Sequence, residues 1–182
     1  ADVDLGNVLS QVVAAKPTLD VIGPVRINAP SAKSDGPGAG GSPIPAIYVS
    51  GGVIHVIEAD GKDVPVPKKK EQVGVSSIVF SDDHRAAGWL VASDFCCTSY
   101  PISPTLVVYR SGKPLRRIEG DRTIFDWKFL AGGRQVAFYT GFLHGTPAQH
   151  YELRDVETGR VLGKWDGELT PKAPGWTRGM RS

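Results

Sequence analysis

The chain lacks several features that would point to a common protein class. It has two cysteines in 182 residues, and with no third cysteine we expect no metal site. No apolar run approaches the roughly 20 residues that span a bilayer, so we expect no membrane insertion. The formal net charge is only +2, and the basic runs at 68–70 and 116–117 have carboxylates beside them. This balance predicts no nucleic acid partner.

Motifs of the familiar enzyme classes are also missing. There is no Gly-x-Ser-x-Gly elbow, no phosphate loop, no His-Glu-x-x-His and no Gly-x-Gly-x-x-Gly. Serine, histidine and aspartate all occur, but their presence alone carries no geometry. We therefore expect no cofactor, and the sequence favours a protein that is not an enzyme.

Glycine and proline are abundant instead, at 22 and 14 residues. Glycine supplies positive φ and proline fixes φ while removing a donor, so this excess predicts many turns and few long helices. Hydrophobic residues at 41% and charged residues at 22% are ordinary for a globular domain. The fold class we predict is mostly β, built from antiparallel sheets, with one short N-terminal helix.

Residues 1–45 form the first predicted part. Apolar residues from Leu5 to Val13 recur at helical spacing, which predicts a helix over about 4–15. Residues 19–27 indicate an edge strand or two short strands, and 28–45 a flexible loop rich in Pro, Gly and Ser. The chain starts at Ala1 and its one methionine is Met180. Signal-peptide removal leaves such a start, and trimming leaves one equally well; a periplasmic or extracellular location is our expectation.

The second predicted part, residues 46–169, is a repeated β domain. Apolar runs on either side of Gly51-Gly52 predict a tight hairpin, and a further strand pair follows. Two longer copies of a strand-turn-strand pattern come next, at 75–118 and 124–165. Phe80 corresponds to Phe129 and Gly112 to Gly159, which gives a period of about 48 residues. Each copy reads as one four-stranded sheet.

These two copies resemble the blades of bacterial WD40-like and TolB-like β-propellers. Those blades pair an aromatic-Ser-x-Asp-Gly-Arg/Lys turn with a later Asp-x-x-Thr-Gly-Lys/Arg turn. Residues 80–85 match the first pattern with His84 in place of Gly, residues 129–134 keep its Gly-Arg end, and 155–160 match the second. The resemblance covers about 46–167 and implies a fold, because blades host enzymes, scaffolds and ligand binders alike.

The number of copies departs from that family, since closed propellers have about four to eight blades. With two good copies and a partial one at about 46–68, the chain either associates into a homo-oligomeric ring or forms an open stack capped by the N-terminal segment. We favour the stack because the copies differ in loop length. Residues 170–182 form a Pro/Gly-rich tail, in which Trp176 is expected to dock on the domain.

The unusual local chemistry is the adjacent pair Cys96-Cys97, in the long connection 92–104. Neighbouring Cα atoms are about 3.8 Å apart, so a disulfide between them is strained and easily reduced. A redox-sensitive or ligand-contacting disulfide, a structural disulfide and two free thiols are the three alternatives.

A composite ligand site is the functional hypothesis. His144 and His150 flank the corresponding connection of the next copy, so the two long loops are expected at the same end of adjacent sheets. The candidate ligand-binding residues are Asp94, Cys96, Cys97, Tyr100, His144 and His150. We expect a non-catalytic binding or interaction module whose partner is a protein, a small molecule or a glycan. The alternatives are a hydrolase that uses the loops around Cys96 and His144, and a structural fragment of a larger propeller.

Overall fold

The computed structural model describes residues 25–30, 42–94, 101–142 and 149–180. Within these ranges the fold is mostly β and consists of three four-stranded antiparallel sheets, as the sequence predicts. The predicted helix over 4–15 lies outside the described residues.

Each sheet is built from four strands that follow one another in the chain. Sheet A contains β1 (Val25–Asn28), β2 (Ala46–Ser50), β3 (Val53–Ile57) and β4 (Asp63–Val66). Sheet B contains β5 (Gln72–Phe80), β6 (Ala86–Ser93), β7 (Ile102–Arg110) and β8 (Arg116–Glu119). Sheet C contains β9 (Thr123–Leu130), β10 (Gln135–Gly141), β11 (His150–Asp155) and β12 (Val161–Asp166).

Tight turns fix the register of the strands. Ser50 pairs with Val53, so the β2–β3 hairpin has the two-residue loop Gly51-Gly52 that the sequence predicts. Both glycines have positive φ, +54° and +73°, which is the geometry that a twisted hairpin requires. The first strand of sheet A, which pairs with β2, comes from the stretch in which we expected an edge strand.

The repeat of the sequence is visible in the turns of sheets B and C. His84 and Gly133, which occupy matching positions of the first turn, both have positive φ, at +54° and +75°. Gly112 and Gly159 match in the second turn, with φ of +72° and +74°. Thus His84 adopts the conformation that glycine adopts in the next copy.

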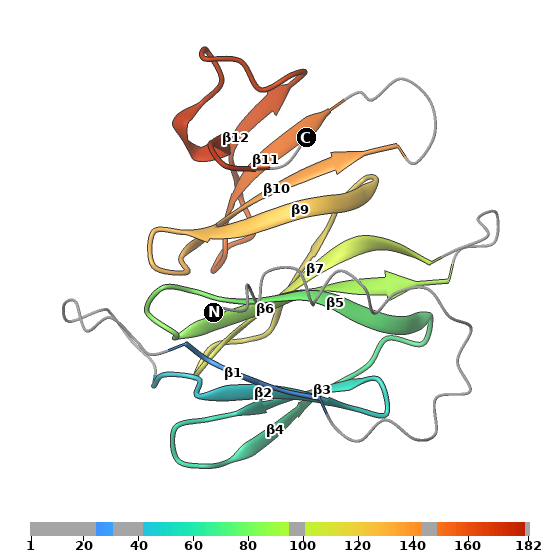
Figure 1. Cartoon of the computed structure of the whole chain (residues 1–182), viewed down its shortest axis with the longest axis vertical. Coiled ribbons are helices and arrows are strands. Elements are labelled where there is room, and N and C mark those ends of the chain that lie inside the picture. The colour runs from blue at the N-terminus through green and yellow to red at the C-terminus, as the bar shows by residue number, and fades with distance from the viewer. Residues whose placement is uncertain (1–24, 31–41, 95–100, 143–148, 181–182) are drawn as a thin grey trace, which may run out of the picture.

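The three sheets are stacked in the order A, B, C (Figure 1). On β6, Trp89 and Val91 belong to the core shared with sheet A, whereas Leu90 belongs to the core shared with sheet C. Strand β6 is therefore buried on both faces and is apolar along most of its length, as expected for a central layer.

The C-terminal tail covers the other face of sheet C. It includes a short 3-10 helix, Gly175–Thr177, and packs Trp176 and Met180 against Tyr151. A Cβ on Gly163 of β12 would come within 3.2 Å of the Trp176 indole nitrogen, so the tail lies close to the strand. The predicted docking of Trp176 on the domain is confirmed.

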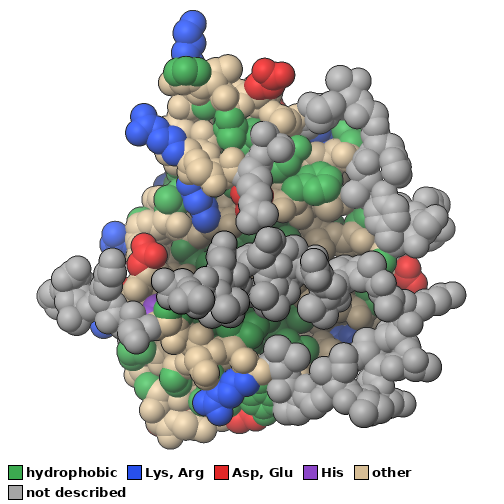
Figure 2. All heavy atoms as spheres, viewed as in Figure 1, with side chains coloured by type: hydrophobic (Ala, Val, Ile, Leu, Met, Phe, Trp, Pro, Cys, Tyr) green, Lys and Arg blue, Asp and Glu red, His purple; other side chains and the backbone are tan. Residues whose placement is uncertain are grey.

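Both basic runs contribute links between consecutive sheets. Lys69 pairs with Glu119, and Arg117 donates to the Pro67 carbonyl oxygen at 2.7 Å. Arg116 of sheet B donates from Nε to the Val156 carbonyl oxygen at 3.0 Å, next to sheet C. On the described part of the face in Figure 2, basic and acidic side chains are interspersed. A helix long and apolar enough to cross a membrane is not found in the described ranges.

Candidate ligand-binding hollow between sheets B and C

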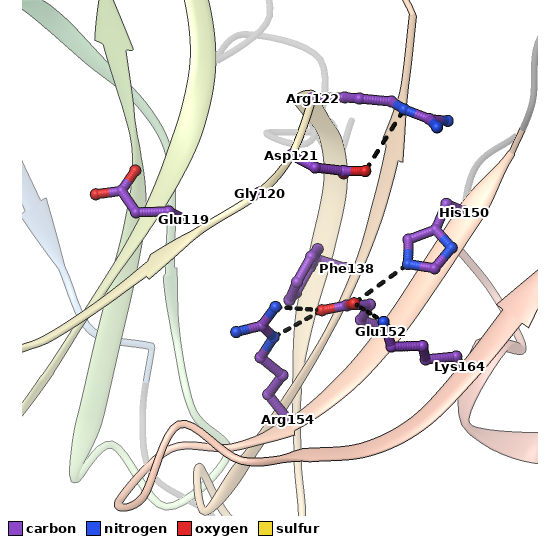
Figure 3. A pocket seen from close by; sticks show the side chains of 9 residues that line it. All are labelled: Glu119, Gly120, Asp121, Arg122, Phe138, His150, Glu152, Arg154 and Lys164. Atoms are coloured by element: carbon purple, nitrogen blue, oxygen red, sulfur yellow. Dashed lines mark hydrogen bonds and ion pairs between the residues drawn. The ribbon is translucent and has the colours of Figure 1, made fainter.

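A hollow of about 530 Å³ lies where sheet B passes into sheet C (Figure 3). One wall is residues 119–122, from the end of β8 and the connection to β9. The opposite wall comes from β11 and β12, and Phe138 of β10 lies beside the hollow, almost fully buried in the core. The lining of the hollow is thus mainly charged, in contrast to the mostly apolar lining of a typical small-ligand pocket.

Strand geometry places the charged groups of the second wall. His150, Glu152 and Arg154 are alternate residues of β11, so their side chains leave the same face of the sheet. Lys164 of β12 is the cross-strand partner of Glu152. The residues between them, Tyr151 and Leu153, face the core under the tail. Packing of the apolar side of β11 against the tail therefore fixes the position of the polar side that lines the hollow.

Glu152 is the centre of a charged network. Its residue surface is only 5% exposed, so its carboxylate requires partners. One oxygen, Oε2, accepts from Arg154 Nε at 2.7 Å and lies 2.6 Å from Arg154 Nη2. The other, Oε1, lies 3.1 Å from Lys164 Nζ and 3.2 Å from His150 Nε2. All its acceptor positions on the two oxygens are in use.

These contacts shift two pKa values in opposite directions. Burial raises the pKa of Glu152, but hydrogen bonds from His150, Arg154 and Lys164 outweigh burial and leave it below its usual range. Burial lowers the pKa of His150, but hydrogen bonds to Asp166 and Glu152 outweigh it and leave it above its usual range. The network thus favours a charged carboxylate beside a charged imidazolium.

Both ring nitrogens of His150 are bound to carboxylates. Nδ1 lies 2.6 Å from Asp166 Oδ1, and Nε2 faces Glu152. A general base needs one ring nitrogen directed at the proton that it removes. In this arrangement His150 holds the network together and has no nitrogen left for a substrate.

The structure places two of the six predicted site residues. His150 lines the hollow, whereas Asp94 is exposed after β6 and is not part of the lining. Cys96, Cys97, Tyr100 and His144 lie outside the described residues, and with them the Cys96–Cys97 pairing. The sequence reasoning missed Glu152, Arg154 and Lys164; the signal for the first two was a run of polar residues at alternate positions of a strand with apolar residues between them.

A second polar cluster lies on the outward face of sheet A. Tyr48 and His55, cross-strand partners on β2 and β3, stack with ring centroids 4.5 Å apart. Asp63 of β4 accepts from the Tyr48 hydroxyl and lies 2.9 Å from His55 Nδ1. The hydrogen bond from Tyr48 is the largest cause that holds the pKa of Asp63 below its usual range.

In the described ranges no group of three or more His, Cys, Asp or Glu side chains is arranged so that it could hold a metal ion. The chain matches no protein-family model and no curated protein sequence. Its functional assignment therefore depends on the geometry of its own residues.

Proposed function

We propose that this chain is a non-catalytic binding module that holds a small ligand in the hollow between sheets B and C. The observation that supports this proposal is the state of His150. Its two ring nitrogens are taken by Asp166 and Glu152, so the hollow offers groups that hold a ligand but, among the described residues that line it, no free imidazole nitrogen. The protein is proposed to act outside the cytoplasm, in the periplasm or the extracellular space.

The test is a titration of the full ¹⁵N-labelled chain, followed by NMR, with a panel of small acids, neutral sugars and short peptides. We expect at least one compound to shift amide signals on β11, β12 and residues 119–122 together. The same samples are assayed for hydrolysis of ester, peptide and phosphoester substrates. Turnover that disappears in His150→Ala would contradict the proposal, as would a panel that leaves all these signals unchanged.

A hydrolase remains the alternative. In the described part of the chain it has one observation in its favour: His55 Nδ1 is held by Asp63, and no described residue bonds His55 Nε2. An imidazole oriented by a carboxylate, with its other nitrogen open, is the arrangement of a general base. Turnover that is lost in His55→Ala but kept in His150→Ala would favour this alternative.

A further inference from the structure

We infer that the ligand of the hollow is a compact molecule with one carboxylate group, bound by Arg154 and Lys164. This inference rests on the proposed function, because it names the chemical class of the ligand that the hollow holds.

The hydrogen-bonding capacity of the two cations is only partly used. Glu152 takes the Nε and Nη2 edge of Arg154, and no described residue bonds the Nη1 atom. A guanidinium has five N–H donors, so the end formed by its two terminal nitrogens can still hold a second carboxylate. Lys164 Nζ has three donors, and Glu152 Oε1 is its one partner in the described chain.

The acceptor side of the same wall is saturated. Glu152 is buried, and its two oxygens are shared among His150, Arg154 and Lys164. A ligand that meets this wall therefore finds unused donors and no unused acceptor. Three cationic side chains meet two carboxylates, those of Glu152 and Asp166, and the positive charge left over favours an anionic acceptor over a neutral carbonyl.

The opposite wall limits the size and charge of the ligand. Asp121 stands on it with a side chain that is 64% exposed and 3.6 Å from Arg122 Nε, whereas the two oxygens of Glu119 are taken by Lys69 and Thr105. A second anionic group on an extended ligand would meet Asp121 and Arg122 together and find no net positive charge on this wall, so a polyanion gains no advantage over a single carboxylate. The Phe138 ring is only 1% exposed and lies 5.6 Å from Arg154 Cζ, so it belongs to the core that supports Arg154.

The experiment compares benzoate with benzamide, which has nearly the same shape and no charge. Both are titrated into the full chain and followed by the amide signals of β11 and β12. We expect benzoate to bind at least about tenfold more tightly than benzamide, because charged hydrogen bonds are the stronger ones. Acetate is expected to compete with benzoate, and a heparin fragment is not.

Two lysine substitutions that remove the same charge are compared, one in the hollow and one in the tail as its control. Lys164→Met removes a partner of the ligand, and we expect it to weaken benzoate binding about tenfold or more. Lys172→Met removes an exposed charge in the tail and should leave binding unchanged. Because Lys164 is 56% exposed, its substitution should leave the fold intact, which thermal unfolding of both variants checks.

The outcomes separate the two proposals. Equal affinity for benzoate and benzamide, an unchanged affinity in Lys164→Met, or tighter binding of the heparin fragment at the hollow would each overturn the carboxylate inference. If neutral sugars or peptides bind in the hollow and carboxylates do not, the carboxylate inference is wrong and the proposed function is kept. If no compound binds there, both proposals fail.

Discussion

Gly88 of β6 lies directly against the Trp127 ring of β9 in sheet C. A Cβ at this position would lie 2.6 Å from the Trp127 ring and 3.0 Å from the Val107 carbonyl oxygen. Trp127 cannot move freely, because it is buried and its indole donates to the Ser77 carbonyl oxygen at 3.2 Å. We predict that Gly88→Ala lowers the free energy of unfolding by about 1–3 kcal/mol through overpacking. Urea unfolding measures the change.

Gly74→Ala is the matched control, since Gly74 lies on the neighbouring strand β5. A Cβ there meets its nearest neighbour, the Ala92 Cβ, at an ordinary 3.8 Å. This substitution should change stability by less than about 0.5 kcal/mol. Equal effects of the two alanines would show that the contact with Trp127 has no special role.

His150 makes the stability of the hollow depend on pH. Its folded-state pKa lies above the usual 6.5, so its contribution is complete below 6.5 and disappears as the pH rises through the raised value. Glu152 has a lowered pKa and contributes above its usual 4.5, so it stays charged through this range. We predict that His150→Gln reduces the loss of unfolding free energy between pH 6 and pH 8. Urea unfolding at the two pH values tests this, and an identical loss in both proteins would contradict it.

Among the larger elements, the C-terminal tail has the clearest structural role. Met180 is only 6% exposed, and together with Trp176 it shields Tyr151 and its neighbours on sheet C. We predict that the double variant Trp176→Ala/Met180→Ala loses about 3 kcal/mol or more of stability and associates through the uncovered sheet face. Urea unfolding and light scattering measure the two effects.

The control for this experiment is Lys172→Ala, an exposed position of the same tail. It should behave like the original chain in both measurements. A double variant that keeps its stability and the mass of the original chain would show that the tail does not stabilise the fold.

We propose that sheets B and C are propeller-blade-like units of an open stack. The position of the tail supports this proposal, because a further sheet could pack on sheet C only by displacing the tail.

At the scale of the whole molecule, the sequence predicted strand composition, the repeat and its turns well. These features depend on local chemistry: Gly112 and Gly159 recur where the backbone needs positive φ, and Gly51-Gly52 closes a hairpin. It also predicted His150 as a site residue, and that residue lines the proposed hollow. The hollow itself could not be predicted, because it forms only where β8 and β11, which are distant in the chain, approach each other.

The burial and charge pairing of Glu152 could not be predicted for the same reason. The sequence does not say how deeply β11 is buried, so a glutamate between His150 and Arg154 would be predicted to lie in solvent. In the structure the stacked sheets bury Glu152 among three cationic side chains. Burial and charge pairing are properties of the packed molecule, and a single sequence without its packing does not express them.

The stacking order has a consequence for how the layers depend on one another. Each sheet is an uninterrupted stretch of chain, and it packs only on its neighbours in the described structure: A on B, B on C, and C on the tail. Stability in such a linear array is close to a sum of layer terms and nearest-neighbour terms. We therefore expect sheet B, which has a neighbouring sheet on each side, to unfold last. Because sheet B lies between sheet A and the hollow, a structural change at the outward face of sheet A does not reach the hollow directly.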